Sequence, residues 1–97
     1  VAYLNEFVDF AHSRRANVLV LFPPIPDIQY GQSQMAIETV YQRLKTDLKI
    51  PLTSTPARFV FPVAFFYDTV YHLNAEGRNA RTTRVISEIR QSMASAR

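Results

Sequence analysis

Apolar residues near the start of the chain recur at the spacing of one helical face. They stand three or four positions apart, with polar residues between them, and they are Tyr3, Leu4, Phe7, Val8 and Ala11. Because an α-helix has 3.6 residues per turn, such a series falls on one side of it. The pattern predicts an amphipathic helix.

A continuous apolar run without alternation follows at residues 18–22. A run of this kind is typical of a strand that is covered on both faces, as in a parallel sheet. Pro23 and Pro24 come next and cannot donate a backbone hydrogen bond. We therefore expect a strand at residues 18–22 that ends at the prolines.

A second helical pattern lies in the middle of the chain, after a loop that is predicted to reach Gly31. Ser33 stands where an N-cap is expected, because its hydroxyl can accept a hydrogen bond from a free N–H of the first turn. The apolar stripe that follows consists of Ile37, Val40, Tyr41, Leu44 and Leu48. Its spacing predicts a helix over this stretch.

The third part of the chain contains a second short strand and a last helix. Residues 58–61 are predicted to form the strand, which Pro62 stops, and residues 63–73 have no clear period and predict a partly buried loop. Asn74 is the expected N-cap of the last helix, and Glu76 in its first turn favours the helix dipole. The stripe expected to be buried on this helix is Val85, Ile86, Ile89 and Met93.

The predicted order of elements is helix, strand, helix, strand, helix. This alternation is typical of the α/β class, and we expect the C-terminal part of a flavodoxin-like three-layer sandwich with parallel strands. Two parallel strands alone leave sheet faces and edges uncovered. We therefore expect residues 1–97 to be a single partial domain that self-associates or pairs with strands from a missing N-terminal part.

Composition agrees with one folded unit. The chain has 97 residues, of which 47% are hydrophobic and 20% charged, and no apolar run approaches the length of a transmembrane helix. It starts at Val1 without a Met or a signal-peptide pattern, which fits a fragment or a processed product. The absence of Cys excludes disulfides and thiolate zinc sites and leaves the compartment open.

Asp68 and His72 are the residues that could carry acid–base chemistry. A carboxylate that accepts a hydrogen bond from one imidazole nitrogen fixes the tautomer of the ring and stabilises the imidazolium. The other nitrogen is then free to deprotonate a hydroxyl. Both residues precede the last helix, at the edge of the predicted sheet where open α/β folds place their active crevice.

The residues around this pair resemble the closing segment of SGNH (GDSL-type) hydrolases and related acyl-modifying enzymes. The segment consists of Asp68, Thr69, Tyr71, His72, Leu73, Asn74, Gly77 and Arg78, followed by Arg81 and Thr82. The resemblance implies an ester hydrolase or acyltransferase that acts on an acyl ester. Because the two histidines lie far apart in sequence and the chain has no Cys, we expect no metal and no cofactor. It also implies that His72 is the general base and Asp68 the acid that orients it.

The resemblance leaves half of a triad unaccounted for in this chain. The nucleophilic Ser, the oxyanion Gly and the Asn of that family precede this segment, and no residue here matches them. Three residues separate Asp68 from His72, whereas two is the commonest spacing in the family. We therefore expect the isolated chain to be inactive. Ser33 does not supply the nucleophile, because we expect it to be a helix N-cap.

A non-catalytic alternative stays open. Asp68 and His72 could simply hydrogen-bond to each other and tie a loop to the core, in a module that recruits a partner through its sheet edge.

His12 is predicted to be solvent-exposed, and two distant histidines make no metal cluster. The last helix carries three arginines, Arg78, Arg81 and Arg84, which do not line up along one side of it and have no aromatic residues between them. We predict that they are solvated, and we do not expect a nucleic-acid partner. Gly77 would permit the close approach of a neighbouring backbone.

Overall fold

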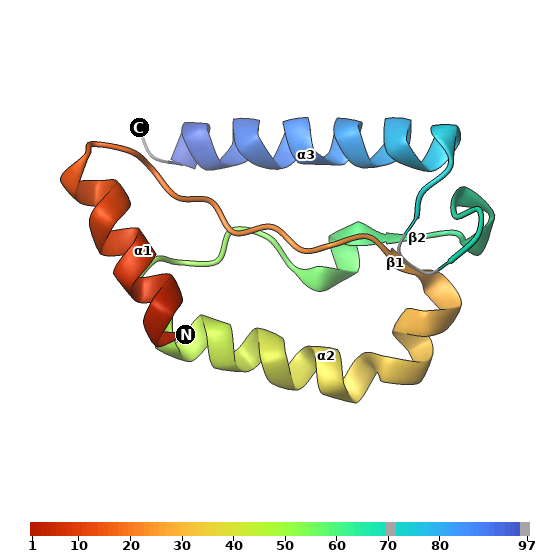
Figure 1. The fold of residues 1–97 in the computed structure, drawn as a ribbon, viewed down its shortest axis with the longest axis horizontal. Helices are drawn as coiled ribbons and strands as arrows, with labels where there is room; N and C mark the ends of the chain where they lie inside the picture. The colour runs from red at the N-terminus through yellow and green to blue at the C-terminus, as the bar shows by residue number, and fades with distance from the viewer. Residues whose placement is uncertain (70–71, 96–97) are drawn as a thin grey trace.

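The computed structural model describes residues 1–69 and 72–95 and contains three α-helices and a two-stranded parallel sheet. The elements in chain order are α1 (Ala2–Ser13), β1 (Ile25–Pro26), α2 (Asp27–Asp47), the 3₁₀ helix η1 (Pro56–Phe59), β2 (Val60–Phe61), the 3₁₀ helix η2 (Val63–Phe65) and α3 (Ala75–Ser95). The predicted α/β class and the parallel direction of the strands are confirmed. Figure 1 shows α2 on one side of the strands and α3 on the other.

The first strand lies further along the chain than predicted. Residues 18–22 are not in a strand, whereas Ile25 pairs with Val60 and Pro26 with Phe61. Proline lacks the N–H but keeps its carbonyl oxygen, so it can stand at the end of a ladder without continuing it. The expectation that the strand ends at Pro23 was therefore wrong, and the predicted strand at residues 58–61 is confirmed only at Val60–Phe61.

Helix α1 forms where the apolar spacing predicts it, and only part of its apolar face is covered. Val8 and Ala11 are buried, while Tyr3 and Phe7 are 85% and 59% exposed. The helix ends in a Schellman motif, because Arg15 takes a positive φ of 61° and the N–H of Ala16 donates to the carbonyl of Ala11.

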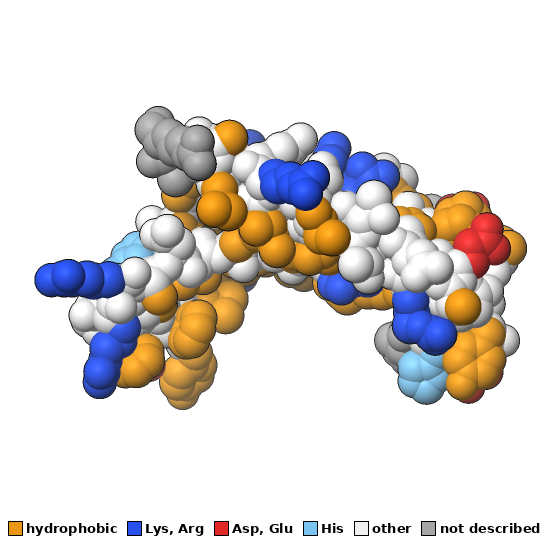
Figure 2. Space-filling model, turned by 90° about the horizontal axis from the view of Figure 1, so that it is seen from above, with side chains coloured by type: hydrophobic (Ala, Val, Ile, Leu, Met, Phe, Trp, Pro, Cys, Tyr) orange, Lys and Arg blue, Asp and Glu red, His pale blue; other side chains and the backbone are white. Residues whose placement is uncertain are grey.

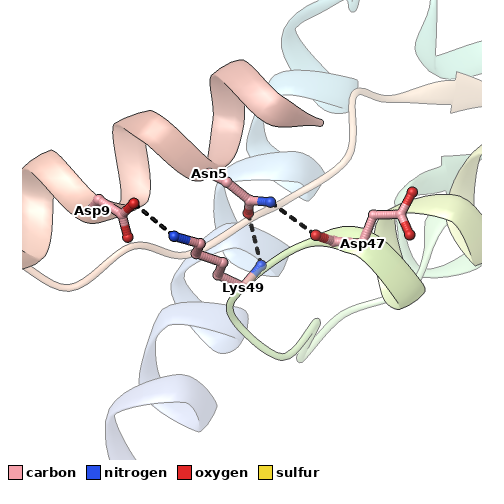
Figure 3. A network of polar contacts seen from close by, with 4 residues as sticks. All are labelled: Asn5, Asp9, Asp47 and Lys49. Carbon is pink, nitrogen blue, oxygen red and sulfur yellow. Dashed lines mark hydrogen bonds and ion pairs between the residues drawn. The ribbon is translucent and has the colours of Figure 1, made fainter.

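A polar network joins α1 to the end of α2 (Figure 3). The Nδ2 of Asn5 donates to the carbonyl oxygen of Asp47 at 2.9 Å, and the Oδ1 of Asn5 accepts from the backbone N–H of Lys49 at 2.8 Å. The Nζ of Lys49 lies 2.7 Å from the Oδ2 of Asp9. One side chain thus satisfies two backbone groups where α2 ends, which fixes the angle between the two helices.

Helix α2 begins six residues earlier than the predicted cap. Its first residue is Asp27, whose Oδ1 accepts a hydrogen bond from the N–H of Ile28 at 2.8 Å. A carboxylate in the first turn also favours the helix dipole. Ser33 therefore lies inside the helix and is not its N-cap, and residues 27–31 of the predicted loop are helical instead.

Three phenylalanines form the centre of the core. Phe22, Phe59 and Phe61 are buried, and the rings of Phe22 and Tyr41 stack with centroids 6.0 Å apart. The half-buried residues packed around them come from every layer and are Leu21, Leu44, Leu52, Phe65, Phe66, Ala80 and Val85. Residues that are remote in sequence meet here, so this small aromatic core holds the strands between α2 and α3.

Helix α3 is predicted correctly in place and incorrectly in burial. Val85 is half-buried, but Ile86, Ile89 and Met93 are 45%, 41% and 59% exposed. The predicted buried stripe is wrong for these three because no described residue packs over them closely enough to exclude water. Within the described residues, no helix combines the length and the apolar character that a membrane crossing requires.

Candidate functional site

A short hairpin between η2 and α3 carries the predicted site. Phe66 and Leu73 form an antiparallel bridge, and the N–H of Tyr67 donates to the carbonyl of His72 at 3.1 Å. These contacts bring the two ends of the loop together. The segment was predicted to be a partly buried loop, and the bridge shows how that loop closes on itself.

Asn74 anchors this hairpin to the first turn of α3. Its Oδ1 accepts a hydrogen bond from the N–H of Gly77 at 2.9 Å, which confirms the predicted N-cap. Its Nδ2 donates to the carbonyl of Ala64 at 2.7 Å, and its backbone N–H donates to the carbonyl of Phe65 at 2.8 Å. One residue therefore links η2, the hairpin and α3.

Gly77 lies in the closest contact of this region. A Cβ at this position would lie 2.3 Å from the carbonyl oxygen of Phe65 and 2.9 Å from the Cδ2 of Leu73. Real Cβ atoms do not approach a carbonyl oxygen so closely, which confirms that Gly77 permits a close backbone approach. Packing of α3 against η2 therefore requires glycine here.

The structure brings Asp68 and His72 together. The Nδ1 of His72 lies 2.9 Å from the Oδ1 of Asp68, although three residues separate the two in sequence. Their side chains are 60% and 48% exposed. Tyr71 and Val70, which lie between them, are outside the described residues.

This arrangement leaves one imidazole nitrogen available for proton transfer. With Nδ1 engaged by the carboxylate, Nε2 is the nitrogen that can accept a proton from a hydroxyl. None of the serine hydroxyls in the described part of the chain hydrogen-bonds to His72. Both side chains are also about half exposed, so the pair is open to solvent.

Two residues without a predicted role adjoin His72. The ring of Tyr67 stacks on the imidazole with centroids 6.2 Å apart and 26° between the planes. The Nη1 of Arg78 donates to the carbonyl of Leu73 at 3.2 Å. Tyr67, His72, Leu73 and Arg78 together line a shallow open depression of about 380 Å³.

A buried charge on α3 was missed in the sequence. Glu88 is fully buried and forms an ion pair with the Nε of Arg58 in η1. The guanidinium of Arg81 lies 5.6 Å from the ring centre of Phe59, so Arg81 is half-buried and does not belong to a solvated face. Because position 88 stands three residues after Val85, it falls on the core-facing side of the helix, and this spacing was the available signal.

His12 is exposed on α1, as predicted. In the parts of the chain that the structure describes, no group of three or more Asp, Glu or His side chains could hold a metal ion. Ser54, which had no assigned role, is 2% exposed, in the segment between α2 and η1.

Comparison of the chain with models of known families, with curated protein sequences and with solved structures gave no match. The function is therefore inferred from the residues of this chain and from their geometry.

Proposed function

We propose that this chain is the C-terminal part of an SGNH-like serine esterase or acyltransferase, in which it supplies the His and Asp of a Ser-His-Asp triad. The observation that carries the proposal is the 2.9 Å contact between the Nδ1 of His72 and the Oδ1 of Asp68. The contact lies just before α3, where the resemblance to that family puts its triad histidine and acid. A wider sequence spacing than the family's usual one is thus compatible with a bonded pair.

In this proposal His72 acts as a general base and then as a general acid. Nε2 takes the proton of a serine hydroxyl supplied from outside residues 1–97 while the serine oxygen attacks the ester carbonyl. The ester C–O bond then breaks, and His72 returns the proton to the leaving alcohol. In the second half-reaction, water or a sugar hydroxyl attacks the acyl-serine. Nε2 of His72 takes the proton of this nucleophile and returns it to the serine oxygen as the acyl group leaves.

The missing residues would also complete the fold. A flavodoxin-like three-layer sandwich needs more strands than the two described here, and the N-terminal part of such a domain would add them beside β1. The same part would bring the nucleophile and the oxyanion donors over the exposed side of His72. The half-exposed state of both site residues is what supports this arrangement.

The competing proposal is a non-catalytic module that associates through its sheet edge. The bridge between Phe66 and Leu73 and the hydrogen bond from Tyr67 to His72 close the hairpin, and the ion pair beside them could be purely structural. Exposed ion pairs contribute little to stability, because solvent screens them. A structural role for Asp68 and His72 would therefore give a small effect on folding and none on chemistry.

The test compares ester hydrolysis by the 97-residue chain with that by a longer chain that includes the preceding sequence. We expect the short chain to be inactive on p-nitrophenyl acetate and the longer one to turn it over. His72→Ala in the longer chain should abolish turnover, with a loss of roughly 10³-fold or more. Asp68→Asn should reduce the rate constant kcat while the protein stays folded.

His12→Ala is the matched control, because His12 is the other histidine of the chain and lies exposed on α1. It should leave turnover unchanged. A longer chain that is inert, or as active with His72→Ala as without it, would contradict the enzyme proposal. The module that binds through its sheet edge would then be the better account.

A further inference from the structure

The depression beside His72 contains a second functional group, the guanidinium of Arg78. We propose that Arg78 binds an oxyanion of the substrate, a phosphate, sulfate or carboxylate group, next to the reacting ester. This inference rests on the proposed esterase or acyltransferase function. It specifies the substrate as an ester that carries negative charge.

The position of Arg78 is set by its own helix and hairpin. Its backbone N–H donates to the carbonyl of Asn74 in the first turn of α3, and its Nη1 donates to the carbonyl of Leu73. Leu73 follows His72 directly in the sequence. The guanidinium is therefore tied to the backbone that carries the imidazole.

Most of the hydrogen-bonding capacity of Arg78 remains available. A guanidinium has five N–H donors in a planar fork that matches the oxygens of a carboxylate or a phosphate. One donor reaches Leu73, and no ion pair of Arg78 with an acidic residue is found among the described residues. Asp68, the acid of the hairpin, is already bonded to His72.

The other walls of the depression fit an ester with one charged end. Tyr67 and Leu73 line the depression together with Arg78 and His72, and they provide apolar surface there. The site lies at the N-terminal end of α3, where the helix dipole adds a further positive potential. An anion bound to Arg78 would thus place an adjoining ester within reach of the His72 side of the depression.

The first experiment detects the anion directly and needs no catalysis. The chain contains two histidines, so the Hε1 resonances of His72 and His12 can be followed in a titration with inorganic phosphate and, separately, with acetate at constant ionic strength. We expect a saturable shift of the His72 resonance with at least one of the two anions and no shift of His12. The anion that produces the shift identifies the phosphate or the carboxylate class.

Variants test whether Arg78 is responsible. Arg78→Gln should abolish the saturable shift, and Arg78→Lys, which keeps the charge, should restore part of it. Arg90→Gln is the matched control, because it removes the same charge from an exposed position of α3 outside the depression. Absence of a saturable shift with both anions, or an equal loss in Arg90→Gln, would overturn the proposal.

A second experiment addresses the substrate in the longer chain. The p-nitrophenyl monoester of succinic acid carries a terminal carboxylate, whereas p-nitrophenyl butyrate is neutral and of similar size. Arg78→Gln should raise the KM for the succinyl ester by roughly 10-fold and leave the butyryl ester unchanged. Equal effects on both esters would contradict anion binding, whereas failure of the esterase proposal itself would appear as turnover that is indifferent to His72.

Discussion

At the scale of single residues, the two glycines of the chain differ in the space that a side chain would have. A Cβ on Gly77 would collide with the carbonyl of Phe65, whereas a Cβ on Gly31 in α2 meets no atom within 4 Å. Neither glycine has a positive φ. The difference between them is therefore steric and not conformational.

Gly77→Ala should lower the free energy of unfolding by about 1–3 kcal/mol, because the backbone of Phe65 must move away from α3. Urea unfolding followed by circular dichroism measures the change. Gly31→Ala is the matched control and should raise the free energy of unfolding by up to ~1 kcal/mol, since alanine is the better helix former. Equal effects in the two variants would mean that α3 does not pack on η2 as described.

Residue roles that depend on near neighbours in sequence could be predicted. Three such features are the N-cap at Asn74, the close backbone approach at Gly77 and the pairing of Asp68 with His72. In each of them the partners lie within about a dozen positions of each other in sequence. The positions of Tyr67 and Arg78 beside the His72 ring could not be predicted, because they depend on how the hairpin closes against the first turn of α3. The prediction of Ser33 as an N-cap was wrong, because a serine is also tolerated inside a helix and α2 begins at Asp27.

At the scale of elements, the contact between η1 and α3 contains a buried charge. Glu88 is fully buried and Arg58 is partly exposed, and their ion pair lies beside the aromatic core. A buried carboxylate that loses its partner is strongly destabilising, because no water replaces the lost interaction. The pair thus fixes the position of η1 on α3.

Arg58→Met should destabilise the fold by about 2–3 kcal/mol, measured by thermal or urea unfolding, since Glu88 is then buried without a counter-charge. The double variant Arg58→Met with Glu88→Leu should recover most of that loss, because apolar side chains of similar volume can replace a buried pair. Non-recovery in the double variant would show that shape rather than charge dominates this contact.

Helices were easier to predict than strands in this chain. All three helices have apolar residues at helical spacing, a signal that each carries along its own length. Strand pairing is decided between remote segments, and here Ile25 meets Val60 across the whole of α2. The apolar run at residues 18–22 is compatible with a strand, but its described neighbours give it no ladder partner.

At the scale of the whole molecule, the chain is less compact than its length allows. Its Cα radius of gyration is 14.8 Å, whereas a compact domain of this length has about 12.5 Å. Apolar side chains gather on the face seen in Figure 2, above α3, and others protrude over α1. Apolar surface of this kind favours association, because burying it releases ordered water.

We expect the isolated chain to self-associate, and the groove between α3 and residues 17–21 offers the most suitable surface. Ile89 and Met93 line that groove and are largely exposed. Replacing both with Lys should raise the dissociation constant of the oligomer by about 10-fold or more in sedimentation velocity, because a charge is costly to desolvate.

The control must add the same two charges to another exposed apolar surface. Ile28 and Val40 on α2 are 60% and 59% exposed, and neither lines the groove at α3. Lys at both positions should leave the dissociation constant nearly unchanged if the α3 groove is the contact. An equal weakening by the α2 pair would mean that net charge alone controls association, since each variant adds the same repulsion. A monomer at all concentrations would instead show that the exposed apolar surface of α3 is tolerated in water, and only the uncovered sheet edge would then favour pairing with further strands.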